Sequence, residues 1–479
     1  MRENELPQSK PDGFASSLGE GASGVPANLA LTPETANPSG EKVVQKCPQA
    51  FLNHKYKNIF PLNMARAQAE VIPNRPAPAL QSFSRNDTIR PNRNAPLPGF
   101  PVREKEANHM SMNTVPERLA ALRAAMAANG VAVYLIPVGD PHASEYLPCH
   151  YTSLTWFSGF HGENSNFVVT RTESALWADG RYFVQAEKEI AGTEIKLQRM
   201  GEPGVPTVEE YCANALNEGE ALGLCGLTAS TALVNDLKKA LEKKGASIKT
   251  LNLEDELWTE GRPALPATPA WILPKEYAGF SPAEKLERLR GKLKELGCTA
   301  QLVGKLDNLA WLLNLRAMDI QCTPYAMSYC YVTPERAVLF INTARLGAEA
   351  AAELKANGVE IQEYDDVLKF LAAETEPQTV LADPASVNFA VYETLQNNAA
   401  LTVKDEADPL LPMKGVKNEV ELAHDREAHL RDAVAMVRFQ KELEERLAAG
   451  EELTELTVDE ILHKYRSAQD KFIVESFGT

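Results

Sequence analysis

Three histidines lie near one another in the sequence, in a segment that also holds carboxylates. His142, His150 and His161 share this segment with Asp140 and Glu145. Imidazole and carboxylate groups hold zinc and other transition metals when a fold brings three or four of them together. The spacings match no ligand pattern, however, and loops of this kind usually hold hydrogen-bonded or solvated imidazoles. We therefore favour the interpretation without a metal.

A second pair of histidines, His424 and His429, lies on a predicted helix. The two are five positions apart, so they point to different faces, unlike the i, i+4 pair of a zinc-binding helix. The charged residues between them, 425–427, indicate a solvated surface.

The sequence holds no GxSxG elbow, P-loop or dinucleotide fingerprint. The glycine-bearing loop FSGFHGENS (157–165) precedes a predicted strand instead of opening a helix, so it is not expected to cradle a phosphate. No catalytic constellation is complete in these residues.

A single arginine raises the most specific chemical question. Arg181 lies in the stretch ADGRYFVQ (178–185), where a predicted strand meets a predicted helix that runs to Ile190. The macrodipole disfavours a cation in the first turn of a helix. Asp179 can cap this helix and offset the positive charge of Arg181. Gly180 has no side chain, so it leaves the backbone open to the approach of a ligand. The guanidinium is then able to donate paired hydrogen bonds to a carboxylate or a carbonyl.

The alternative role for Arg181 is structural. An internal ion pair with Asp179 or Glu187 would hold the junction between the strand and the helix. Both interpretations stay open at the level of the sequence.

The elements that position these residues follow a plan that occurs twice. A capping box begins a predicted helix, apolar residues at helical spacing form its buried stripe, a glycine ends it, and an apolar strand follows. The second copy keeps a constant offset from the first. The matched positions are Thr114 and Ser281, Glu117 and Glu284, Leu119 and Leu286, Leu122 and Leu289, Met126 and Leu293, Gly130 and Gly297, and Asp140 and Asp307.

This repetition predicts an α/β fold with two related modules, 114–262 and 280–410, joined by a Pro-rich linker around 262–266. Each module is expected to hold a buried strand and then a strand, a polar turn and a second strand. These predicted segments are 131–136, 166–179, 298–303 and 330–342.

The last region, 411–479, is predicted to be mainly helical. A long amphipathic helix spans 417–449, and a shorter one begins at the capping box of Thr457 and Glu460. The residues 472–474 are expected to begin a strand. At the other end of the chain, residues 1–109 are rich in Pro and Asn and are predicted to be a disordered extension, with a start near Met110 as the alternative.

The composition excludes several classes of partner. The formal charge is −16 and the pI is near 5.2, so we expect no binding to nucleic acid or to an anionic membrane. The seven cysteines form no CxxC pair, which fits a reducing cytoplasm. No apolar stretch is long enough to span a membrane.

Five segments, taken in order, resemble the landmark segments of aminopeptidase P, the cytosolic three-domain Xaa-Pro aminopeptidase. The resemblance runs from about Val115 to the last residue. The segments are DPHASEYLP (140–148), WFSGFHG (156–162), WADGRYF (177–183), LAWLLNLR (309–316) and MKGVKNEVELAHDREAHLRDAVAMVRF (413–439).

The resemblance implies a fold and an activity. Two creatinase-like amino-terminal domains would precede a pita-bread catalytic domain, in a homodimer. Members of the family remove the amino-terminal residue of a peptide when proline stands second, using two divalent metals, manganese or zinc. Arg181 matches the family's arginine that contacts the substrate, which makes Arg181 the candidate substrate-binding residue.

The sequence also departs from the family. The final segment FIVESFGT resembles the stretch just before a substrate-binding histidine, and the family's metal ligands, two Asp, one His and two Glu, have no counterpart here. We therefore expect a truncated catalytic domain, no dinuclear metal site and no peptidase activity of this chain by itself. In addition, the family's loop after SGFxG usually continues Ser-Ala-Gly, whereas this chain has Glu163-Asn164-Ser165.

A different class of function stays open as the alternative. The chain would then be a non-catalytic peptide-binding or dimerisation module that retains the creatinase-like domains. Prolidase and creatinase are less similar relatives, because they have a single amino-terminal module of this kind.

Overall fold

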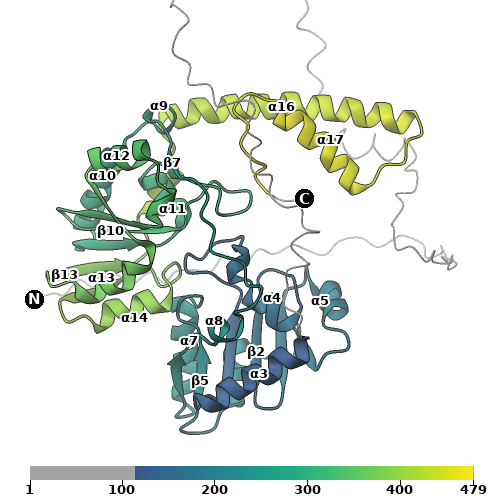
Figure 1. Cartoon of the computed structure of the whole chain (residues 1–479), viewed down its shortest axis with the longest axis vertical. Coiled ribbons are helices and arrows are strands. Elements are labelled where there is room, and N and C mark those ends of the chain that lie inside the picture. The colour runs from purple at the N-terminus through teal and green to yellow at the C-terminus, as the bar shows by residue number, and fades with distance from the viewer. Residues whose placement is uncertain (1–113, 478–479) are drawn as a thin grey trace, which may run out of the picture. The chain divides into compact units, whose positions relative to one another are not determined.

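Figure 1 shows the computed structural model of the chain, which describes residues 114–477. The predicted extension, 1–109, lies outside the described residues. The fold is α/β, as predicted, with helices on both faces of two mixed sheets.

Within the described residues, two six-stranded sheets share one topology. The first has the strand order β4-β3-β2-β1-β5-β6, and the second has β12-β11-β10-β8-β13-β14, which is the same order once the strands are numbered within each sheet. The directions also agree, because the two pairs formed by the second strand are antiparallel and the other pairs are parallel. The repeated pattern in the sequence therefore corresponds to a repeated topology.

The strands have the following bounds. The first sheet comprises β1 (Val133–Pro137), β2 (Asn166–Thr170), β3 (Ser174–Ala178), β4 (Ile195–Arg199), β5 (Ala221–Leu224) and β6 (Ser247–Thr250). The second comprises β8 (Ala300–Val303), β10 (Ser328–Val332), β11 (Ala337–Ile341), β12 (Val359–Gln362), β13 (Gln378–Ala382) and β14 (Leu401–Asp405), and a separate ribbon pairs β7 (Trp271–Ile272) with β9 (Leu315–Arg316). The predicted module boundaries, 114–262, 280–410 and 411–479, stay predictions, since the sheets locate only the strands inside them.

Helices occupy most connections between these strands, apart from the hairpins β2–β3 and β10–β11 (Figure 1). Those of the first half are α3 (Val115–Ala128), α4 (Ser153–Ser158), α5 (Phe183–Glu189), α6 (Val208–Asn214), α7 (Thr231–Glu242) and α8 (Leu253–Leu257). Those of the second half are α9 (Lys275–Ala278), α10 (Pro282–Glu295), α11 (Leu306–Leu312), α12 (Ala348–Ala356), α13 (Val367–Ala373), α14 (Phe389–Asn397) and α15 (Leu410–Gly415). The long helix α16 (Glu419–Ala448) and α17 (Glu455–Ser467) pack against each other.

The predicted helix starts are confirmed at α3 and α10. Both have a complete capping box and a proline in the first turn. The predicted stripes, Leu119, Leu122 and Met126 on α3 and Leu286, Leu289 and Leu293 on α10, are at most 1% exposed.

Strand alternation divides the core into layers. Tyr134 and Ile136 of β1 pack with α3 and α4, whereas Val133 and Leu135 face the opposite side of the sheet. That opposite side forms one continuous cluster with residues of the second sheet, such as Phe340. The two modules therefore share a hydrophobic core.

The modules also meet through reciprocal backbone hydrogen bonds. Ser230 and Asn388, the N-caps of α7 and α14, form an antiparallel bridge. Backbone N–H groups at corresponding positions of the two modules donate hydrogen bonds to carbonyls of the other module. An isologous dimer interface has the same reciprocal pattern between two subunits, whereas here both halves belong to one chain. The bonds are Thr231 N to Val387 O, Phe389 N to Ala229 O, Ala232 N to Pro384 O and Ala390 N to Gly226 O, all between 2.8 and 3.0 Å.

One matched pair of the predicted repeat differs in the structure. Asp140 is 3% exposed in a loop, where its carboxylate accepts hydrogen bonds from the backbone of His142 and Ser144. Asp307 instead lies in the first turn of α11 and pairs with Lys414. The two aspartates therefore match in sequence position but not in role.

The carboxy-terminal predictions need two corrections. The shorter helix begins at Glu455 and not at the Thr457 box, because an acidic residue is already favourable in a helix's first turn. The residues 472–474 form no strand, since no strand among the described residues pairs with them.

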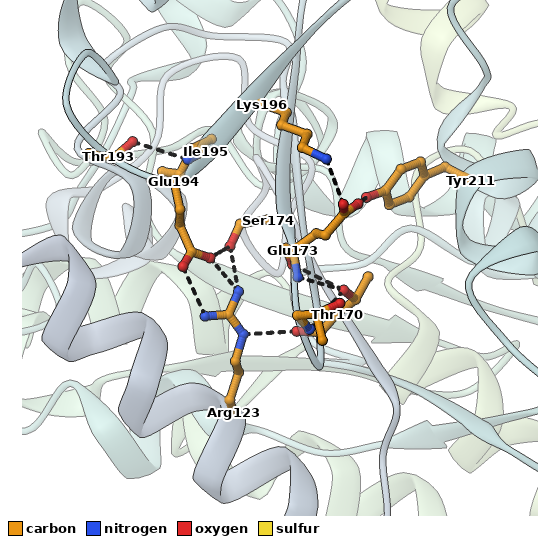
Figure 2. Close-up of polar contacts among 10 residues, drawn as sticks. Arg123, Thr170, Glu173, Ser174, Thr193, Glu194, Ile195, Lys196 and Tyr211 are labelled. Carbon is orange, nitrogen blue, oxygen red and sulfur yellow. Dashed lines mark hydrogen bonds and ion pairs between the residues drawn. The ribbon is translucent and has the colours of Figure 1, made fainter.

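A polar network fixes the start of β3, the strand that leads to Arg181 (Figure 2). Arg123 of α3 donates to Thr170 O at 3.0 Å and to Ser174 Oγ at 3.0 Å. Ser174 Oγ donates to Glu194 at 2.6 Å, and Glu194 also pairs with Arg123. The hairpin of β2 and β3 is thus tied to both α3 and the residue that precedes β4.

Candidate functional site

Arg181 lies in a turn between β3 and α5, and not in the first turn of the helix as predicted. The helix begins at Phe183 with Tyr182 as its N-cap. The carboxylate of Asp179 accepts from the backbone N–H of Arg181 at 2.9 Å, and the carbonyl of Asp179 accepts from Tyr182 N at 3.0 Å. Asp179 therefore stabilises the turn instead of capping α5. Because the arginine precedes the helix, its conflict with the macrodipole is reduced.

The guanidinium of Arg181 forms an ion pair with Asp179. Nη2 lies 2.7 Å from Oδ2, and Nε lies 3.1 Å from Oδ1. The hydrogen bonds from Arg181, more than any other contact, lower the pKa of Asp179 to about 2, and the same pair raises the pKa of Arg181. Glu187, the other expected partner, pairs with Arg199 instead.

The ion pair leaves the guanidinium accessible. The Arg181 side chain is 62% exposed, whereas that of Asp179 is 19% exposed. Within residues 114–477, Nη1 has no hydrogen-bond partner, so its two N–H groups are available to a ligand. The guanidinium carbon lies 5.1 Å from the centroid of the Tyr182 ring, and Val184 on α5 is 65% exposed beside this turn. The surface can therefore donate hydrogen bonds to a carboxylate or carbonyl next to apolar contacts.

The glycine-bearing loop lies against this turn. Asn164 Nδ2 donates to Asp179 Oδ2 at 3.1 Å, and Tyr182 Oη donates to Glu163 Oε2 at 3.1 Å. At the edge of the loop, the backbone N–H of His161 donates to Glu189 at 2.9 Å. The structure thus brings together two segments that the sequence analysis had treated separately.

The loop has its shape because of two backbone requirements. A Cβ on Gly162 would lie 2.1 Å from the ring of Phe160, which is fully buried. Asn164 has φ +46, a left-handed conformation that asparagine tolerates better than most residues. The close approach at Gly162 lets the chain double back so that the next two side chains face the turn at Arg181.

The sequence analysis missed Glu163, Asn164 and Tyr182. A signal was present in the predicted hairpin, because β2 and β3 pair antiparallel with Asn166 opposite Trp177. The residues just before β2 and just after β3 must then lie at the same end of the sheet.

The histidines of the first segment have separate partners. His142 is 1% exposed, with Nδ1 2.7 Å from Gly304 O and Nε2 2.8 Å from Tyr364 Oη. A carbonyl can only accept, so Nδ1 carries the proton and Nε2 accepts from the tyrosine. Burial lowers the pKa of His142, which favours this neutral form. His150 Nδ1 lies 2.7 Å from Pro263 O.

The described residues do not supply a metal site. Within 114–477, no three His, Cys, Asp or Glu side chains form a group that could hold a metal ion. His424 and His429 contact backbone oxygens of Glu276 and Asp425, at 3.2 and 2.8 Å. The part of the chain that the structure describes therefore does not fit the metal pair that the resemblance implies, and no chemical step is assigned to a metal here. The same residues contain no helix long and apolar enough to cross a bilayer.

Comparison with known families identifies both modules. Residues 118–257 and residues 261–421 each match a model of the creatinase/prolidase N-terminal domain. The first range contains every strand of the first sheet, and the second range contains every strand of the second sheet.

Individual relatives extend this similarity. The chain is 34% identical over 397 residues to aminopeptidase P2 of Arabidopsis thaliana, covering 76% of this chain and 56% of that protein. It is 35% identical over 385 residues to a probable Xaa-Pro aminopeptidase P of Sordaria macrospora, covering 77% and 62%. The chain thus spans less than two thirds of the length of these relatives.

One solved structure is similar over the same part. The crystal structure of X-prolyl aminopeptidase from Caenorhabditis elegans, described as a cytosolic enzyme with a di-nuclear active site, aligns with a TM-score of 0.71 at 32% identity. The alignment covers 77% of this chain and 62% of that one.

Proposed function

Because both modules of this chain belong to the creatinase/prolidase N-terminal domain family and the chain is similar to aminopeptidases P, we propose that these modules act in an Xaa-Pro aminopeptidase. The substrate would be a peptide with proline in second position. Arg181 would bind that peptide, donating from Nη1 to a carbonyl or carboxylate. The observation that carries this role is an exposed guanidinium whose direction is fixed by its contacts with Asp179.

Substitution of Arg181 tests the binding role directly. We expect Arg181→Ala to weaken binding of the peptide Ala-Pro-Gly about tenfold, because the variant loses the charge-assisted hydrogen bonds that the guanidinium donates. Ligand-observed NMR titration of the chain measures this affinity even when it is weak. Unchanged binding by Arg181→Ala would remove the arginine from the site.

A matched control is available in the same module. Arg171 is 58% exposed and pairs with Glu220 at 2.7 Å, much as Arg181 pairs with Asp179. Arg171→Ala removes the same charge from the same domain, so it should leave peptide binding unchanged. Equal losses in the two variants would mean that net charge, and not Arg181, governs binding.

We further propose that hydrolysis depends on a pair of manganese or zinc ions held outside the described residues. Such a pair supplies an activated water and a polarised scissile carbonyl. The chain by itself is then expected to leave an Xaa-Pro peptide intact when manganese or zinc is added. Release of the first residue by the purified chain, measured by mass spectrometry, would overturn this expectation.

The remaining proposals concern the state of the protein in the cell. By its resemblance to the family, the chain is expected to be cytoplasmic and to form a homodimer. The X-prolyl aminopeptidase of C. elegans is described as a cytosolic enzyme, which supports the proposed location in the cytoplasm. Light scattering of the purified chain would test the homodimer.

A further inference from the structure

The loop next to Arg181 places a carboxylate beside the candidate peptide site. Glu163 and Asn164 of this loop each contact a residue that neighbours Arg181 in the turn. Asn164 donates to Asp179, which holds the guanidinium. Glu163 accepts from Tyr182. These two residues of the loop therefore face the candidate peptide site.

The position of the Glu163 carboxylate is fixed by the phenol of Tyr182. Tyr182 has its ring edge-on to buried Phe160, with centroids 6.1 Å apart. The pKa of Tyr182 is raised, first by burial and then by its hydrogen bond to Glu163, so the hydroxyl remains a donor at neutral pH. A side chain that is otherwise free to rotate is thus held beside Arg181.

Glu163 forms no ion pair within the described residues, although its attraction to Arg181 is among the smaller causes that raise the pKa of that arginine. Within the described residues, its Oε1 has no hydrogen-bond or ion-pair partner, and its Oε2 contacts only the neutral phenol. The nearby carboxylates differ in this respect, because Asp179 pairs with Arg181 and Glu187 pairs with Arg199. Glu163 is therefore an available acceptor for a positive group.

We propose that Glu163 is a specificity residue that selects peptides whose first side chain carries a positive charge. The inference rests on the proposed function, in which Arg181 holds the peptide. A lysine or arginine side chain of the bound peptide would then meet the Oε1 atom of Glu163.

The size of the preference for a charged peptide depends on how well solvent screens the Glu163 carboxylate. Two opposite charges about 6 Å apart at a solvated surface favour the charged ligand by about threefold to tenfold. The preference should shrink as salt is raised, because the Debye length falls from about 10 Å at 0.1 M to about 3 Å at 1 M.

Two peptides of equal length measure this preference. Lys-Pro-Gly and norleucine-Pro-Gly differ only in the terminal ammonium of the first side chain. Ligand-observed NMR titrations with the full chain should show Lys-Pro-Gly binding threefold to tenfold more tightly at 50 mM salt, and nearly equal affinities at 500 mM.

Three variants assign the preference to one side chain. Glu163→Gln should make the affinities for the two peptides equal without weakening the binding of norleucine-Pro-Gly. Tyr182→Phe should reduce the preference as well, because it releases the carboxylate while keeping its charge. The matched control is Glu187→Gln, which removes the same charge from α5, where it pairs with Arg199, and should leave the preference intact.

The outcomes separate this inference from the function on which it rests. Equal binding of both peptides by the wild type, or an equal loss for both in Glu163→Gln, overturns the selectivity while Arg181 keeps its role. The second result would show that Glu163 contacts the amino terminus common to all peptides. If neither peptide binds, the proposed function and the inference are both overturned.

Discussion

Glu254 is a buried carboxyl group whose ionisation should make the stability of the chain depend on pH. It lies on α8, is 3% exposed, and contacts the hydroxyl of Tyr134 on β1 at 2.5 Å. That hydroxyl also contacts Leu251 O at 2.9 Å and accepts from Leu253 N at 3.1 Å. The single phenol proton cannot serve both the carboxylate and the carbonyl.

A protonated Glu254 satisfies every contact of the Tyr134 hydroxyl. The carboxylic acid donates to Tyr134 Oη, and the phenol donates to Leu251 O. Burial accordingly raises the pKa of Glu254 from 4.5 to about 7, although the hydrogen bond with Tyr134 acts in the opposite direction. The folded protein therefore retains a proton that the unfolded chain releases.

The direction of the pH effect follows from this difference in protons bound. The stabilisation is fully present below pH 4.5 and is lost as pH rises toward 7, where the folded carboxyl also ionises. One pKa unit corresponds to about 1.4 kcal/mol, so the free energy of unfolding should fall by about 3 kcal/mol across this window.

Substitution by glutamine isolates this effect. The amide of Glu254→Gln can donate to Tyr134 Oη as the protonated acid does, but it does not titrate. Urea unfolding of both proteins, followed by tryptophan fluorescence between pH 4.5 and 8, should show the variant gaining about 3 kcal/mol relative to the wild type as pH rises. Parallel curves for the two proteins would refute the reasoning, whatever their absolute difference.

Three further substitutions have expected outcomes that denaturant unfolding can measure. Arg123→Ala should destabilise the chain by about 1–2 kcal/mol, because it leaves Thr170 O without its donor and opens the network of Figure 2; a change within error would mean that the network is dispensable. Gly162→Ala should cost about 1–3 kcal/mol, since the new methyl overlaps the buried ring of Phe160. Gly291→Ala is its counterpart in α10, where a Cβ meets nothing within 4 Å, and should stabilise by up to about 1 kcal/mol; equal effects of the two alanines would contradict the steric argument.

Local patterns in the sequence were sufficient for the helices and hairpins. The capping boxes at Thr114 and Ser281 depend on residues three positions apart, so their geometry is decided within one turn of chain. The hairpins 166–179 and 330–342 likewise follow from alternation around a polar turn, and both are present as β2–β3 and β10–β11. The position of Arg181 at a strand end drew attention to it in the same way, but its substrate-binding role was predicted from the resemblance to the family and stays a prediction.

Long-range packing decided what the sequence left open. Arg181 had two possible acidic partners, and the turn at Asp179 selected one because Glu187 lies on α5 with Arg199. The tight fit at Gly162 and Phe160 then placed Glu163 beside the same turn. The ion pair of Arg181 with Asp179 spans only two residues, whereas the contact of Glu163 with Tyr182 depends on where two strands bring separate loops.

The sequence by itself determined the α/β class, the repeated plan and the family, because capping, periodicity and motif residues act over short stretches of chain. Only the tertiary structure decided that the two modules join through the N-caps Ser230 and Asn388, and that Glu163 and Asn164 surround Arg181. Those contacts join residues far apart in the chain, and they form only when two sheets have folded and their faces share one apolar core.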